Sequence, residues 1–156
     1  MESDLSQCSN AVLRQAMRRL GQLYDEALAP SGLRATQHAL LSTIDALGAP
    51  TMGLLAERLV MDLSGLGHTL KPLARDGLIA RLPDTRDRRA RRVTLTELGR
   101  TKLAETTRLW RGAQDRFESV FGTERAADLR AVLRLLVSQE FHDAFAAGIP
   151  LTGQAG

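Results

Sequence analysis

The feature that most constrains the fold of this chain is a close pair of short helices followed directly by a hairpin. Thr51 and Asp62 can each cap the start of a helix, and Gly77 stands where a helix commonly ends. Residues 78–82 and 92–95 then alternate as strands do, on either side of the polar loop 83–91. The pattern predicts a mainly α domain with a small β-hairpin, an α+β fold.

The second helix of the pair, expected from Asp62 to Asp76, has two distinct faces. Leucines at spacings of three and four predict a buried face made of Leu63, Leu66, Leu70 and Leu73. The polar side chains share the opposite face, which consists of Ser64, His68, Lys71 and Arg75. That face is free to contact a partner.

Amphipathic helices flank this central region on both sides. Apolar residues recur at helical spacing in residues 5–28 and 36–47, before the helix pair. After the hairpin, Thr96 opens a long helix on which Leu103, Trp110 and Phe117 repeat every seven residues, and Gly122 ends it. One last helix is expected over residues 124–147, followed by a flexible tail at residues 148–156.

Composition excludes several classes of protein. The single Cys8 cannot form an internal disulfide, and His38, His68 and His142 lack metal-ligand spacing, so no metal or cofactor is expected. No glycine-rich phosphate loop or nucleophile–base arrangement indicates an enzyme. Acidic residues near the start and the absence of a long apolar run predict a cytoplasmic protein without a membrane segment.

The basic residues are concentrated in one part of the chain. The net charge is +3, yet residues 51–92 hold nine lysines and arginines against five acidic residues. A basic patch of this kind indicates a polyanionic partner, although charge alone does not separate DNA from RNA or anionic lipid.

Residues 54–99 resemble the multiple antibiotic resistance regulator (MarR) family. The resemblance is carried by LAERL (Leu55–Leu59) and by LARDGLIARLPDTRDRRARRVTLTELG (Leu73–Gly99), in which Asp87 and Arg89 form the DxR pair of the wing. The flanking helices fit the same family in number and order, so the resemblance covers nearly the whole chain.

The resemblance implies a winged helix-turn-helix domain at residues 36–95 and a helical dimerisation region at residues 1–35 and 96–147. It implies a homodimeric regulator, with repression favoured, that binds a pseudo-palindromic operator in double-stranded DNA. The long apolar stripes agree, because on a monomer they would expose a large hydrophobic patch. Packing of the same stripes within one chain stays open as the alternative.

A recognition helix in the major groove reads base edges, whereas contacts to phosphates position the protein. Ser64 and His68 are therefore candidates for base or adjacent phosphate contact, and Lys71 and Arg75 for phosphate contact. Gly65 and Gly67 depart from the family, which often places longer polar side chains there, so direct readout is expected to be sparse. An ordinary solvated helix face remains the alternative.

The hairpin loop is unusually rich in arginine. Six arginines face only Asp84 and Asp87, and they are Arg81, Arg86, Arg88, Arg89, Arg91 and Arg92. By its match to the family motif, Arg89 is the candidate for insertion into the minor groove, with Asp87 orienting the basic side chains. Arg86, Arg88 and Arg91 would hold flanking phosphates. A flexible salt-bridged loop is the alternative.

The resemblance also implies a small aromatic or phenolic effector bound where the dimer helices meet the winged domain. Candidate lining residues are Met17, Tyr24, His38, Leu41 and Trp110, although such residues are also common in cores. Cys8 lies near the start of the first helix, where some relatives carry an oxidation-sensing cysteine; a small packed hydrophobe is the other reading.

Two further functions stay open beside a specific regulator. A winged domain can bind protein instead of nucleic acid, a possibility against which the arginine-rich loop argues. A sequence-independent architectural DNA binder would bind all duplexes with a similar salt dependence.

Overall fold

The computed structural model describes residues 7–87 and 89–151. The sequence predictions that concern residues 1–6, Arg88 and residues 152–156 lie outside this part of the chain. The chain divides into two compact units, residues 1–113 and 114–156, which are described separately. The elements of the first unit are α1 (Ser9–Leu28), the 3-10 helix η2 (Ala29–Ser31), α2 (Ala35–Leu47), α3 (Met52–Arg58), α4 (Leu63–Arg75), β1 (Ile79–Pro83), β2 (Arg91–Leu95) and most of α5 (Glu97–Phe121).

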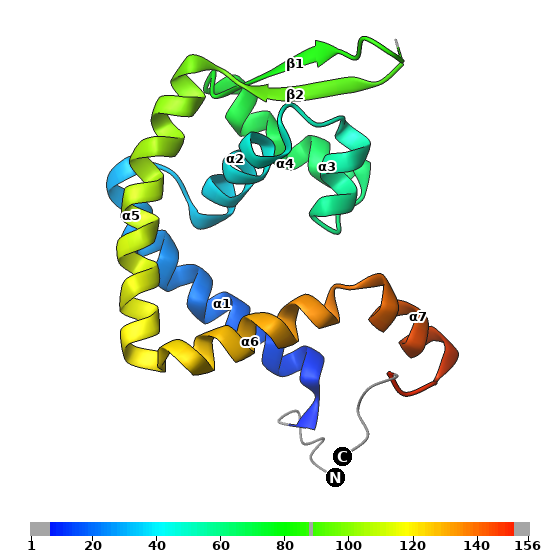
Figure 1. Cartoon of the computed structure of the whole chain (residues 1–156). Coiled ribbons are helices and arrows are strands. Elements are labelled where there is room, and N and C mark those ends of the chain that lie inside the picture. The colour runs from blue at the N-terminus through cyan, green and yellow to red at the C-terminus, as the bar shows by residue number, and fades with distance from the viewer. Residues whose placement is uncertain (1–6, 88, 152–156) are drawn as a thin grey trace. The chain divides into compact units, whose positions relative to one another are not determined.

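Helices α2, α3 and α4 lie together against the β1–β2 hairpin (Figure 1). Their apolar faces, the inward residues of the hairpin and two leucines of the adjoining segments, Leu33 and Leu78, form the core. Its other members are Leu40, Leu41, Ile44, Leu55, Ala56, Leu66, Leu70, Leu73, Ile79, Val93 and Leu95. This arrangement confirms the predicted α+β fold, in which a hairpin wing follows a helix-turn-helix.

The two helices of the helix-turn-helix begin at the predicted caps. The Thr51 hydroxyl accepts the backbone N–H of Leu54 at 3.2 Å, and the Asp62 carboxylate accepts that of Gly65 at 2.7 Å. Gly77 ends the region in the left-handed conformation, with φ of 72°. These side-chain acceptors satisfy N–H groups that a helix start leaves unpaired.

The hairpin is antiparallel, with Ile79 opposite Leu95 at its base and Pro83 opposite Arg91 toward its tip. Strand β2 also joins the segment between α2 and α3, because the Val93 N–H donates to the Pro50 carbonyl at 2.9 Å and Thr51 forms a bridge with Arg92. The wing is therefore fastened to the helix-turn-helix along its second strand.

One leucine predicted to be buried on α4 is exposed. Leu66, Leu70 and Leu73 are fully buried, whereas 59% of Leu63 is accessible. Leu63 is the first residue of α4, and helical side chains tilt toward the N-terminus. Its side chain therefore extends past the start of the helix, where no preceding helical turn lies beneath it.

The second unit consists of the end of α5 with α6 (Thr123–Leu136) and α7 (Gln139–Ala147). Gly122 separates α5 from α6 with φ of 97°, as the sequence predicts. The single helix expected over residues 124–147 is wrong, because Ser138 interrupts it. The Ser138 hydroxyl donates to Leu135 O at 2.8 Å and accepts the Phe141 N–H at 3.1 Å, which ends one helix and caps the next.

Ala126 is the one buried residue among those described in the second unit. Several of its large apolar side chains are exposed, namely Val120, Val132, Leu133, Val137, Phe145 and Ile149. Such a unit has almost no interior of its own.

In the described part of the chain, no helix combines the length and apolar character needed to cross a membrane.

Candidate nucleic-acid interface

The polar face of α4 is accessible along its length. The four predicted contact residues, Ser64, His68, Lys71 and Arg75, are all exposed, while three leucines anchor the other side of the helix in the core. Ser64 and His68 lie in the first half of the helix, and Arg75 lies in its last turn, beside Asp76 at 2.9 Å. The helix can therefore present these side chains to a partner without unpacking.

The two glycines of α4 open this face. A Cβ at Gly67 would meet no atom within 4 Å, and one at Gly65 would lie 3.4 Å from the Asp62 carboxylate. The Gly67 carbonyl accepts a hydrogen bond from the Arg81 guanidinium at 3.4 Å, which links α4 to strand β1. Gly67 leaves backbone rather than side chain at the surface, and this allows close approach to a partner.

The wing loop carries its arginines in two different settings. Arg86, Arg89 and Arg91 are exposed, as the sequence analysis requires of DNA contacts. Arg92 is instead half-buried, with its guanidinium 2.5 Å from the Asp84 carboxylate and 2.8 Å from the Ala49 carbonyl. The count of six arginines therefore overstates the number available to a partner.

Among the described residues of the wing, Asp84 pairs with an arginine side chain and Asp87 bonds to the backbone. The Asp87 carboxylate accepts the backbone N–H of Arg89 at 2.9 Å, and no arginine side chain of the described residues pairs with it. Asp84 makes the ion pair. The sequence motif placed Asp87 beside the contacting arginine, but only the tertiary structure brings Asp84 and Arg92 together across the hairpin.

Two of the predicted effector-site residues come together between α2 and α5. The His38 and Trp110 rings stack with their centres 5.9 Å apart, and His38 Nδ1 lies 3.0 Å from the Thr106 hydroxyl. Ser42 lies beside the other ring nitrogen at 3.5 Å. Thr106 is fully buried and was missed by the sequence analysis, since a threonine at helical spacing carries no distinctive signal.

The other predicted effector-site residues are dispersed. Leu41 is fully buried in the core of the winged domain, Tyr24 is half-buried on α1, and 69% of Met17 is accessible. Cys8 immediately precedes α1 and is exposed, so in this structure it is not a packed hydrophobe.

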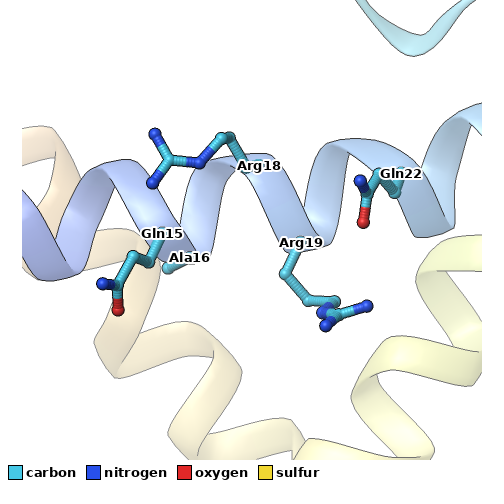
Figure 2. Close-up of a pocket in the computed structure, with 5 residues that line it drawn as sticks. All are labelled: Gln15, Ala16, Arg18, Arg19 and Gln22. Atoms are coloured by element: carbon cyan, nitrogen blue, oxygen red, sulfur yellow. The ribbon is translucent and has the colours of Figure 1, made fainter.

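Two surface hollows in the first unit were not predicted. Figure 2 shows the first, which lies along α1 and is lined by Gln15, Ala16, Arg18, Arg19 and Gln22 of that helix alone. The second, of about 600 Å³, lies between α2 and α5 and is lined by Asp45, Arg100, Leu103, Ala104, Thr107, Arg108 and Arg111. The helical spacing of Arg100, Ala104, Arg108 and Arg111 is the sequence signal that could have identified it.

His38 is expected to make folding sensitive to mild acid. Burial lowers the pKa of His38 from 6.5, and Thr106, Ser42 and Trp110 offer no charge to oppose this. Below pH 6.5 the unfolded chain therefore binds a proton that the folded chain does not, so stability falls with pH until the lower folded pKa is reached. The melting temperature between pH 7.5 and 5 should fall less for His38→Gln than for the parent.

The matched control for this prediction is His68→Gln, because His68 is exposed on α4. Its melting temperature should follow the parent's pH dependence. A parallel pH profile for His38→Gln and the parent would contradict the buried, neutral state of His38.

The fold and the exposed basic surfaces define a winged helix-turn-helix protein. The family model that matches the chain is that of the MarR family, over residues 33–90. The chain is similar to the transcriptional regulator MosR of M. tuberculosis, whose crystal structure is in complex with DNA. The two sequences are 35% identical, the alignment covers 81% of this chain and 93% of the MosR chain, and the TM-score is 0.72. The chain therefore belongs to the MarR family, whose members are transcription regulators and not enzymes.

Two other comparisons extend this result. The transcriptional activatory protein BadR of Rhodopseudomonas palustris is 35% identical over 102 residues, which are 62% of this chain and 52% of that protein. The chain thus matches about half the length of this curated relative. A mutant E. coli MarR complexed with operator DNA has a TM-score of 0.78 at 22% identity, covering 88% of this chain and 98% of that one, and it supports the fold alone.

Proposed function

We propose that this chain is a homodimeric transcription regulator that binds a pseudo-palindromic operator. Helix α4 enters the major groove with Ser64 and His68 toward the bases and with Lys71 and Arg75 toward phosphates. The exposed wing arginines bind the adjacent minor groove and its phosphates. The observation that carries the proposal is that one packed core supports both an exposed polar α4 face and an exposed arginine wing.

The homodimer is supported by the exposed apolar surface of the terminal helices. The second unit buries a single described residue, and α1 exposes Val12, Leu13, Met17 and Leu23. Monomeric proteins rarely leave apolar surfaces of this extent in water, because burying apolar area is the main favourable contribution to folding and association. In this proposal residues 36–95 bind DNA, and the helices of residues 1–35 and 96–147 serve self-association.

The signal that controls the regulator is a small aromatic or phenolic effector, oxidation of Cys8, or both. The stacked His38–Trp110 pair and the neighbouring hollow between α2 and α5 support an aromatic effector bound next to the winged domain. The exposure of Cys8 supports its access to oxidants.

The test is selection of fragments from sheared bacterial genomic DNA by the purified protein at near-physiological salt, with and without a thiol oxidant. We expect recovery of a pseudo-palindrome whose half-sites are centred about 10 base pairs apart. Loss of the fragments under oxidant in the parent, but not in Cys8→Ser, would identify the cysteine as the sensor.

Other outcomes would replace this proposal. Recovery of fragments without a shared sequence would favour the architectural binder, and no recovery would favour a protein-interaction module. Transcription in vitro from a promoter that contains the operator tests the favoured direction, repression, against activation, the role named for the R. palustris relative.

A further inference from the structure

The wing loop contains a buried acidic side chain. Asp84 is only 6% exposed, although it lies in the most basic part of the chain. Its carboxylate accepts the backbone N–H groups of Arg86 at 2.7 Å and Asp87 at 2.9 Å, and it pairs with the Arg92 guanidinium. The backbone hydrogen bonds, and after them Arg92, lower the pKa of Asp84, so the carboxylate stays charged near neutral pH.

Arg92 connects this loop to the helix-turn-helix. Besides Asp84, its guanidinium donates to the Ala49 carbonyl at 2.8 Å. Ala49 has φ of 58°, a left-handed conformation that residues other than glycine seldom adopt, and it lies in the connection between α2 and α3. Arg92 therefore joins three parts of the chain: the loop at the wing tip, strand β2 and the connection that precedes α3.

We propose that Asp84 and Arg92 are positioning residues for DNA binding, which hold the exposed wing arginines in register with α4 and do not themselves contact DNA. The inference rests on the proposed function. It assigns opposite roles to residues that composition would treat alike: Arg86, Arg89 and Arg91 face outward, whereas Arg92 is part of the support.

Removal of the Asp84 charge separates this role from simple electrostatics. DNA is a polyanion, so loss of a negative charge from the wing should strengthen binding if the charge acts only through the field of the protein. If Asp84 positions the wing, loss of the ion pair should weaken binding. The two mechanisms thus predict changes of opposite sign for one substitution.

The first experiment measures the affinity of the full-length dimer for the selected operator, with each variant well below its melting temperature. Asp84→Asn is expected to bind about tenfold more weakly than the parent, as loss of a charge-assisted hydrogen bond implies. The matched control is Glu57→Gln, which removes an exposed negative charge from α3 of the same domain. This control should bind as tightly as the parent or more tightly.

A second pair of variants tests Arg92. Arg92→Lys keeps the positive charge but cannot span two acceptors with a planar fork, so it should lose most of the affinity that Arg92→Gln loses. Adding Arg92→Gln to Asp84→Asn should cost less than Arg92→Gln costs alone, because the ion pair is already broken and only the hydrogen bond to the Ala49 carbonyl is still lost. A phosphate-contacting Arg92 would instead tolerate lysine and give additive losses.

The sequence preference distinguishes positioning of the wing from general weakening of the fold. The parent should prefer operators with A·T base pairs under the wing over versions with G·C there, because a narrow minor groove attracts arginine. Asp84→Asn should lose this preference and still reject operators altered in the major-groove half-sites. Tighter or equal binding by Asp84→Asn would overturn the inference alone, whereas a parent that binds no duplex would overturn the proposed function and the inference together.

Discussion

Arg89→Ala is expected to weaken operator binding more than about tenfold, the largest loss for any single arginine of the wing. Arg89 is exposed, and its backbone N–H donates to the Asp87 carboxylate at 2.9 Å, a hydrogen bond that helps to fix the point from which the side chain extends. An arginine in a narrow minor groove gains from the concentrated negative potential there. Fluorescence anisotropy with a labelled operator at several salt concentrations measures both the affinity and its salt dependence.

The salt dependence shows whether the lost contact is electrostatic. Each phosphate contact that disappears should make the plot of log K against log salt shallower by about one unit. Arg116→Ala is the matched control, because Arg116 is also exposed but lies in the second unit on α5. If Arg89→Ala and Arg116→Ala bind the operator as the parent does at moderate salt, the wing has no part in binding.

The elements of the fold that local rules determine could be predicted from the sequence. Helix α2 was expected at residues 36–47 and spans Ala35–Leu47, and the caps Thr51 and Asp62 act as predicted. Leucine periodicity and a side-chain acceptor are visible in a short window of sequence. The break at Ser138 was missed because apolar periodicity continues across it, while a serine inside a helix gives only a weak local signal.

The candidate site was harder to predict because it depends on contacts between distant residues. The exposed face of α4 follows from the positions of its leucines. By contrast, the roles of Asp84 and Arg92 depend on the hairpin pairing and on Ala49, which is 43 positions from Arg92 in sequence. A count of charges treats Arg92 as part of the basic surface and Asp84 as an acid that partly neutralises that surface. Such a count does not consider whether either side chain is buried.

The same limit applies to the effector region. His38 and Trp110 were both proposed from their residue types and do stack, whereas Leu41 proved to be core. Sequence spacing predicts which residues share one face of a helix. It does not predict which face of α5 meets which face of α2, and that geometry decides whether a residue lines a cavity.

Gly99→Ala is expected to destabilise the folded protein by about 3 kcal/mol, which for a chain of this size lowers the melting temperature by roughly 6–12 °C. Gly99 is buried in the first turn of α5, where an added Cβ would overlap the Leu78 carbonyl oxygen. That carbonyl cannot move freely, because it accepts the Thr96 N–H at 3.0 Å while the Leu78 N–H donates to Leu73 at 2.9 Å. Thermal unfolding followed by circular dichroism measures the effect.

Gly112→Ala provides the control, because Gly112 lies in the same helix with no atom within 4 Å of its would-be Cβ. Alanine favours helix over glycine by about 0.5–1 kcal/mol, so this variant should melt slightly above the parent. The two substitutions add the same methyl group to α5 and should change stability in opposite directions. Equal melting temperatures for Gly99→Ala and Gly112→Ala would mean that α5 does not start against Leu78, and the glycine that closes the LTELG segment would then need an explanation other than close backbone packing.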